Sequence, residues 1–121
     1  MDASVFVDFW QMKCCGDPFQ IGSVVRWTVS PWSSAWPDTH FPDRLARIDY
    51  REEHHGGADL TEITGMVTSI DIVRWGYEEF GGTWYPKFDS ATLVSVDRAD
   101  GSDDDDGDLE FVGYLVEIGN Y

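Results

Sequence analysis

Apolar and polar residues alternate in short runs along this chain, which is the period expected of β-strands with one buried face. The clearest run is Val24–Ser30, in which Val25, Trp27 and Val29 share one face. Runs rich in β-branched and aromatic residues predict four more strands, at Ser4–Trp10, Thr64–Trp75, Ala91–Arg98 and Glu110–Ile118.

The longest of these runs changes face part of the way along. Val67 points to one face of the expected strand, whereas Ile70 and Ile72 point to the other, so the alternation slips near Ser69. Such a slip is typical of a β-bulge, which inserts one extra residue and bends the strand. We therefore expect a bulge or a sharp bend at this position.

Five strands with one strongly bent member predict a mainly β (α+β) fold. The expected architecture is a small five-stranded, strongly bent antiparallel sheet or an SH3-like barrel, with one helix. The stretches Phe19–Trp27 and Gly65–Ile70 are similar to opening strands of SH3-like barrels. No internal repeat or linker interrupts the pattern, so residues 1–121 are expected to form a single domain.

The one expected helix covers about residues 42–55. Pro42 suits the first turn of a helix, and Gly56 suits the position just after its end. Glycine, proline and polar residues predict loops at Pro31–Pro42, at Gly76–Pro86 and, within an acidic run, at about 99–109.

Acidic residues outnumber basic ones, with 23 Asp and Glu against 8 Lys and Arg in 121 residues and a net charge of -15. This excess argues against direct binding to nucleic acid or an anionic membrane, and it fits a basic protein partner, a cation or plain solubility. Eight of the acids lie between Asp97 and Glu110. We expect that run to be a solvated hairpin loop, with docking to a basic partner or weak cation binding as alternatives. It does not match an EF-hand, because Leu109 stands where the required glycine belongs.

The candidates for soft metal ligands are His40 and two adjacent pairs, Cys14-Cys15 and His54-His55. Adjacent side chains diverge in regular structure, so at most one of each pair can reach one ion, and the zinc alternative names Cys15 and His55. Adjacent cysteines form no ordinary disulfide, which fits the cytoplasm. The sequence shows no secretory signal, and no apolar run is long enough to form a transmembrane helix. We therefore expect a cytoplasmic protein.

No spacing of Ser, Cys, His or carboxylate residues identifies a catalytic residue, and no cofactor is expected apart from the zinc alternative. Three tryptophans in predicted loops are candidate anchors for a partner, since Trp is enriched in binding hot spots. They could equally fill the ends of a small barrel. The candidate partner-binding residues are therefore Asp103, Asp104, Asp105, Asp106, Trp32, Trp36 and Trp84.

Three segments of the chain resemble an uncharacterised family of small actinobacterial proteins, a domain of unknown function. They are Trp10-Gln-Met-x-Cys-Cys-Gly16, Glu52-Glu-His-His-Gly-Gly57 and Phe111-Val-Gly-Tyr-Leu-Val-Glu117. The resemblance implies an intracellular bacterial protein, and it carries over no catalytic residue.

These observations predict a non-enzymatic, acidic interaction domain that binds a protein partner. An inhibitor, an immunity protein, an antitoxin or a nucleic-acid mimic would have these properties. Two alternatives stay open: a small zinc-binding module that uses Cys and His, and an enzyme whose site the sequence does not identify.

Overall fold

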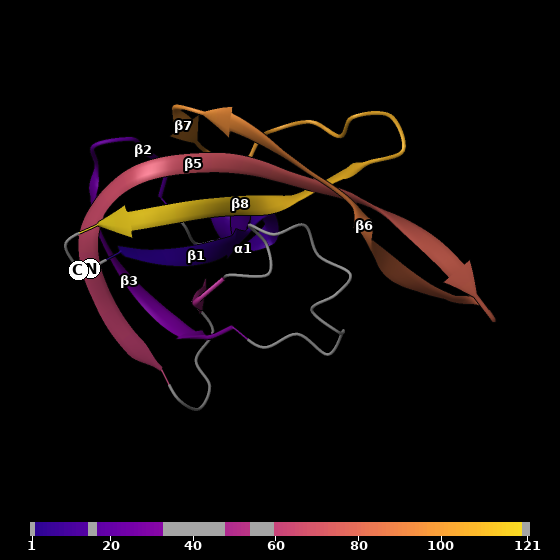
Figure 1. Ribbon diagram of the computed structural model, residues 1–121, viewed down its shortest axis with the longest axis horizontal. Coiled ribbons are helices and arrows are strands. Elements are labelled where there is room, and N and C mark those ends of the chain that lie inside the picture. Colours follow the sequence, from indigo (N-terminus) through magenta and orange to yellow (C-terminus); the bar gives the residue numbers. More distant parts are fainter. Residues whose placement is uncertain (1, 15–16, 33–47, 54–59, 120–121) are drawn as a thin grey trace.

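A computed structural model describes residues 2–14, 17–32, 48–53 and 60–119 of the chain (Figure 1). These residues form one short helix and eight strands. In chain order the elements are β1 (Asp2–Asp8), α1 (Phe9–Cys14), β2 (Phe19–Gln20), β3 (Val24–Pro31), β4 (Tyr50–Glu52), β5 (Thr61–Phe80), β6 (Thr83–Val96), β7 (Arg98–Ala99) and β8 (Glu110–Gly119).

Six of the strands form one sheet in the order β3-β4-β1-β8-β5-β6, and β3 also pairs with β5. This additional pairing joins five strands into a ring, outside which β6 extends the sheet (Figure 1). The pairing of β1 with β4 is parallel, whereas the other pairings in this sheet are antiparallel. The predicted mainly β, strongly bent fold is confirmed, and its sheet is mixed rather than purely antiparallel.

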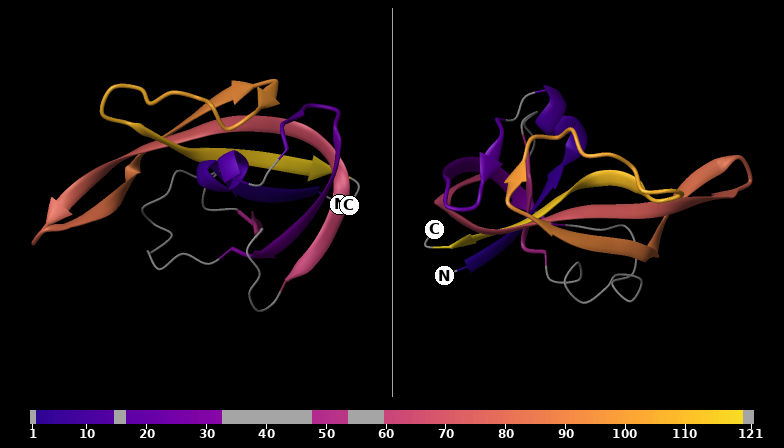
Figure 2. Two further views of the ribbon diagram at one scale, coloured as in Figure 1. Left: turned by 180° about the vertical axis from the view of Figure 1, so that it is seen from behind. Right: turned by 90° about the horizontal axis from the view of Figure 1, so that it is seen from above.

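Strand β5 is the longest element and curves around the other strands (Figure 1, Figure 2). Its first part pairs with β3, and its later part lies between β8 and β6. The register against β8 shifts between Val67 and Ser69, so the irregularity predicted near Ser69 is confirmed. The bulge increases the local bend, which allows one continuous strand to close the ring.

Beyond the ring, β5 and β6 continue as a two-stranded hairpin that projects from the rest of the molecule (Figure 2). We call residues 76–87 the hairpin arm. Gly81 and Gly82, with φ of 60° and 84°, form its two-residue turn, and positive φ at both positions is what a type I′ hairpin turn requires. The loop predicted at Gly76–Pro86 is therefore wrong, because the aromatic residues around the glycines extend both strands up to the turn.

The helix predicted over 42–55 is also wrong where the structure describes it. Residues Tyr50–Glu52 form β4, which lies between β1 and β3. The N–H of Asp49 donates to the Ser4 carbonyl at 2.9 Å. Backbone groups of β1 and β3 need hydrogen-bond partners. The strand pairing that supplies them outweighs the weak helical pattern of this segment. Residues 42–47 and 54–55 lie outside the described residues.

Helix α1 instead occupies Phe9–Cys14, so the strand predicted over Ser4–Trp10 ends two residues early, at Asp8. The amide of Gln11, which is fully buried, donates to the Glu52 carbonyl at 3.0 Å. Phe9 packs against Phe111 with ring centroids 5.7 Å apart. These contacts turn the chain away from the sheet directly after β1.

Buried apolar residues form two clusters, one on each face of the sheet. Alternation along β1 explains the division, because Val5 and Val7 belong to the first cluster and Phe6 belongs to the second. The first cluster includes Ile63, Val67, Ile70, Ile72, Tyr114, Val116 and Ile118. The second consists of Phe6, Ile48, Val73, Trp75, Val112 and Leu115.

Candidate functional site

A groove of about 960 Å³ lies between the hairpin arm and the loop of residues 100–109 that precedes β8. Residues far apart in the sequence meet there, because α1, β5, β6 and β8 each contribute to its wall. Its apolar lining is Phe9, Tyr77, Trp84, Phe111 and Val112, and its acidic lining is Asp103, Asp105, Asp108 and Glu110. We call this feature the acidic groove.

Tyr114 anchors the first part of the loop that borders the acidic groove. Its hydroxyl donates to the carboxylate of Asp103 and accepts a hydrogen bond from the N–H of Gly101 at 3.0 Å. Burial raises the pKa of Tyr114, and the hydrogen bond to Asp103 raises it further. Tyr114 therefore remains a neutral donor that holds the Asp103 carboxylate in place.

Two further hydrogen bonds attach the loop to the sheet. The Nε of Arg74 donates to the Asp104 carbonyl at 2.9 Å, and the N–H of Phe111 donates to the Asp105 carboxylate at 2.8 Å. The sequence predicted a solvated hairpin loop, and residues 104–106 are indeed exposed. However, the loop is tied to β5 and to β8 rather than free in solvent.

The four acids of the acidic groove form no ion pair with any residue in the described ranges. Two ion pairs of the protein, between Arg26 and Glu62 and between Arg51 and Asp8, lie elsewhere. Carboxylates that form no ion pair attract cationic ligands, and a concave surface concentrates their field. The groove is therefore electrostatically suited to a positively charged ligand.

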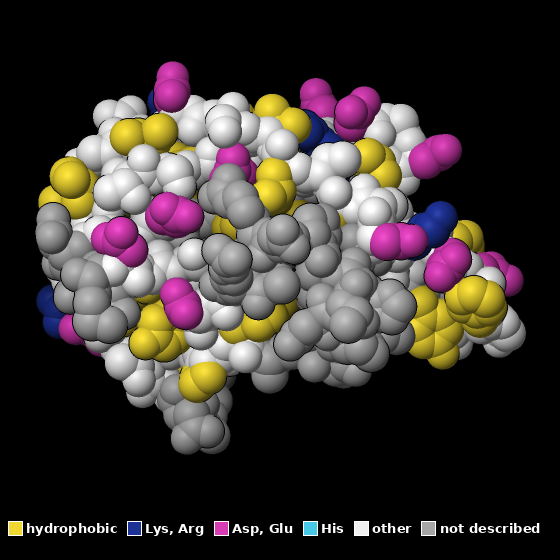
Figure 3. Space-filling model, viewed as in Figure 1, with side chains coloured by type: hydrophobic (Ala, Val, Ile, Leu, Met, Phe, Trp, Pro, Cys, Tyr) yellow, Lys and Arg dark blue, Asp and Glu magenta, His cyan; other side chains and the backbone are white. Residues whose placement is uncertain are grey.

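Large apolar side chains are exposed on the hairpin arm beside these acids. Trp84 is 64% exposed and Phe80 is 61% exposed. Figure 3 shows hydrophobic side chains gathered at the free end of the arm, next to acidic ones. Exposed aromatic side chains in a group, rather than singly, are typical of interaction surfaces.

The sequence candidates for partner binding that the structure describes separate into three groups. Asp103, Asp105 and Trp84 come together in the acidic groove, whereas Asp104 and Asp106 lie on the same loop but do not line it. Trp32 packs against Phe6 with ring centroids 5.4 Å apart, which supports the alternative that its ring fills the core. The remaining candidates, Trp36 for a partner and Cys15 and His55 for zinc, lie outside the described residues.

Sequence reasoning did not select Phe9, Tyr77, Asp108 or Glu110 as site residues. A signal for Tyr77 was present, because a Gly-Gly hairpin turn sets the pairing of the two strands and places Tyr77 near Trp84. No comparable signal existed for Phe9, which reaches the groove only because α1 packs against the start of β8.

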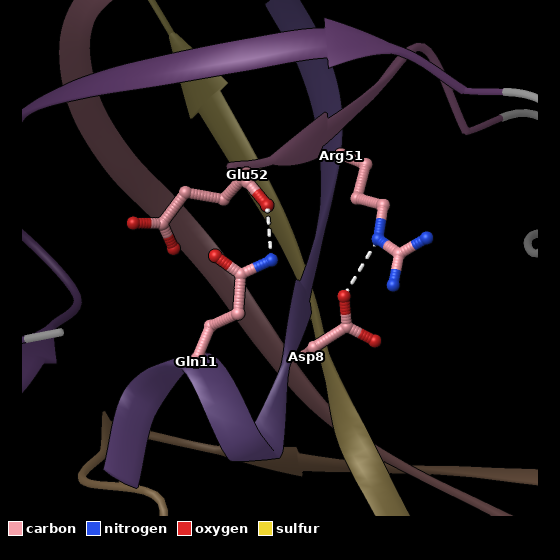
Figure 4. A network of polar contacts seen from close by, with 4 residues as sticks. All are labelled: Asp8, Gln11, Arg51 and Glu52. Atoms are coloured by element: carbon pink, nitrogen blue, oxygen red, sulfur yellow. Dashed lines mark hydrogen bonds and ion pairs between the residues drawn. The ribbon is translucent and has the colours of Figure 1, made fainter. Parts of the chain in front are cut away.

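A second polar cluster lies at the end of β1 (Figure 4). The Nε of Arg51 donates to the Asp8 carboxylate at 2.6 Å. Burial raises the pKa of Asp8, and the charge of Arg51 and the hydrogen bond from it oppose this effect. Because these contacts join β1, α1 and β4, we interpret the cluster as structural.

A smaller pocket, of about 330 Å³, is lined by Met12, Asp17, Phe19, Trp27 and Glu52 among others. Within the four described ranges, no three His, Cys, Asp or Glu side chains are placed to share a metal ion. The same part of the chain contains no helix of the length and hydropathy needed to cross a membrane.

The fold and the groove define a small, acidic, mainly β protein. The chain belongs to a family of unknown function (DUF6578), whose model matches residues 1–120. Membership of an uncharacterised family, which three sequence segments suggested, is thereby confirmed. Neither the comparison with curated proteins nor that with solved structures finds a match.

Proposed function

We propose that this protein is a non-enzymatic interaction domain that binds a basic segment of a partner protein in the acidic groove. One observation carries the proposal: four carboxylates and four aromatic side chains line the same groove. Carboxylates attract Lys and Arg from a distance and accelerate association. Aromatic faces then contact the cations and their aliphatic stems at short range.

The composition of the groove favours a basic side chain over a bare metal ion. Calcium takes six to eight oxygen ligands at close range. In this groove the carboxylates of Asp103 and Asp105 already accept hydrogen bonds from the protein, and Tyr77, Trp84 and Phe111 supply rings rather than oxygens to much of the wall. A Lys or Arg side chain uses both kinds of surface.

A peptide titration tests this function. The probe is a fluorescent octapeptide that alternates lysine and valine, measured at about 20 mM and about 300 mM salt, where the Debye length falls from about 20 Å to about 6 Å. We expect binding at low salt that weakens at high salt. The double variant Asp108→Asn with Glu110→Gln should weaken binding roughly tenfold, because it removes two charges from the groove.

The matched control is the double variant Asp2→Asn with Asp97→Asn. It removes the same charge from two exposed side chains outside the groove. Its affinity should stay within about twofold of the unmodified protein at high salt, because long-range effects are screened there. No binding at low salt, or an equal loss in both double variants, would contradict the proposed function.

A second candidate is the zinc-binding module, and one observation favours it. Asp17 and Glu52 line the same small pocket, and in the sequence they lie close to the Cys14-Cys15 and His54-His55 pairs. Metal analysis of protein purified without a histidine tag tests this candidate. One zinc per chain, with a lower melting temperature after chelation, supports it, whereas no zinc and unchanged melting remove it.

We further propose a bacterial, cytoplasmic setting, with an inhibitor, an immunity protein, an antitoxin or a nucleic-acid mimic as the forms that the function could take. The adjacent Cys14 and Cys15 support a reducing compartment, since adjacent cysteines form no ordinary disulfide. A gene for a basic toxin beside the gene for this protein would support the immunity role.

A further inference from the structure

Two backbone edges of the hairpin arm are not covered by any described strand, the outer edge of β6 and the edge of β5 beyond Trp75, and only the β5 edge lies on the side of β8. Pairing of β5 with β8 stops at Trp75 and Glu110, whereas β5 continues to Phe80 with only β6 beside it. The carbonyl oxygen of Asp108 lies 3.6 Å from the position of a Cβ on Gly76, so the acidic loop still lies against β5 at that residue. The uncovered part of the β5 edge is therefore residues 77–80, which we call the open edge.

Pro86 establishes which backbone groups point to the open edge. Pro86 is paired with Tyr77, and it has no N–H to donate. Directly opposed residues in an antiparallel pair alternate between hydrogen-bonded and non-hydrogen-bonded pairs, so Tyr77 and Pro86 form a non-hydrogen-bonded pair. The N–H and C=O of Tyr77, and by alternation those of Glu79, therefore point away from β6.

The open edge and the acidic groove adjoin each other, because Tyr77 belongs to both. Glu79 is paired with Trp84 and thus shares its face of the arm. Trp84 also lines the groove. A strand placed along the open edge would therefore direct alternate side chains to the face of the arm on which the acidic groove lies.

We infer that a basic segment of the partner adds to β5 as an extended strand along the open edge. This inference rests on the proposed function and assigns the bound segment a conformation. Backbone hydrogen bonds to Tyr77 and Glu79 would supply affinity, as in other cases of strand addition. Successive side chains of a strand alternate in direction, so the segment carries Lys or Arg at every second position, facing the acids.

Charge selects the occupant of the open edge. A second copy of this chain also has a net charge of -15, and Glu78 and Glu79 lie on the edge itself, so two copies repel each other there. A basic segment instead complements Glu78, Glu79 and the acids of the groove. The structure thus favours a cationic partner strand over self-pairing.

Backbone methylation of the peptide tests strand addition directly. The lysine–valine octapeptide is compared with two isomers, one N-methylated at every lysine and the other at every valine. The isomers have equal charge and composition, but each loses the N–H donors of only one edge. We expect one isomer to bind at least about tenfold more weakly, as loss of two or more backbone hydrogen bonds implies, while the other stays within about threefold of the parent.

Hydrogen exchange and one variant locate the new hydrogen bonds. Saturating peptide should slow exchange of the Tyr77 and Glu79 amides at least about tenfold, and it should leave that of Glu78, already bonded to β6, nearly unchanged. Glu79→Pro removes one donor of the open edge, where proline is compatible with strand pairing. It should weaken binding more than Glu79→Gln, which removes only the charge.

The outcomes separate the inference from the proposed function. If both methylated isomers bind as tightly as the parent peptide, the groove function stands and strand addition is overturned. If no peptide binds at low salt, both are overturned. Dimerisation of the protein without peptide, measured by sedimentation and abolished by Glu79→Pro, would assign the open edge to a second copy and overturn the inference.

Discussion

The ring and the hairpin arm use the same strand, β5, in opposite ways. Within the ring, β5 pairs with β3 along its first part and then lies between β8 and β6, and Ile63, Val67 and Ile70 are almost fully buried. On the arm, β5 pairs only with β6 among the described strands, and Phe80 is 61% exposed. Consecutive parts of β5 therefore have different roles. The first part contributes buried side chains that stabilise the fold, and the second part presents a surface that is available for binding.

The largest expected effect is a difference in the free energy of unfolding between a substitution in the ring and one on the hairpin arm. Ile70→Ala leaves a cavity in the ring and should lower the free energy of unfolding by about 2–5 kcal/mol. Phe80→Ala should lower it by about 1 kcal/mol or less, because its ring mainly contacts Tyr85, at a centroid distance of 6.2 Å. Urea denaturation measures both values, and equal losses would break the comparison.

Tyr114→Phe should lower the free energy of unfolding by about 1–3 kcal/mol, because the carboxylate of Asp103 and the N–H of Gly101 lose a partner. The pKa of Tyr114 is raised in the folded state, so above its ordinary value of about 10 the unfolded state loses this proton first. The difference in free energy of unfolding between the unmodified protein and Tyr114→Phe should thus be constant below that pH and shrink above it. A difference that grows with alkaline pH would contradict the assigned hydrogen bonds.

Gly82→Ala tests whether the arm folds independently of the ring. The positive φ of Gly82, 84°, costs an alanine roughly 1–2 kcal/mol. We expect faster hydrogen exchange at Thr83 and Trp84, with exchange of ring amides such as that of Val116 unchanged. Equal acceleration in both regions would show that the arm and the ring unfold as one unit.

The smallest expected effect concerns the polar cluster that fixes β4. Arg51→Met should cost about 1 kcal/mol at neutral pH, because the Arg51 side chain is 41% exposed and the pair is partly screened by solvent. The pKa of Asp8 is raised in the folded state, so ionised Asp8 opposes folding and its protonation relieves that cost. The loss in free energy of unfolding caused by Arg51→Met should therefore shrink as the pH falls through the folded-state pKa of Asp8. A loss independent of pH would contradict this role of Arg51.

Local pattern predicted most of the fold but only part of the site. The alternation around Val25 and Trp27 predicts a strand whichever strand it pairs with. The slip in alternation near Ser69 is also visible in the sequence. The three-residue strand β4 depends on its neighbours β1 and β3, which local pattern does not contain. The acidic groove forms only because Phe9 and Phe111, which are far apart in the sequence, contact each other in the fold. Composition therefore predicted the negative charge of the groove but not its shape.

The most direct test of the central claim is to map where the lysine–valine octapeptide binds by chemical-shift changes in isotope-labelled protein. We expect the largest changes at the Trp84 indole, at the Tyr77 and Glu79 amides and along residues 103–110. Little change is expected in β3, which lies on the ring. Changes concentrated on β3 and β4, with none at Trp84 or in the acidic loop, would contradict the assignment of the acidic groove as the binding site.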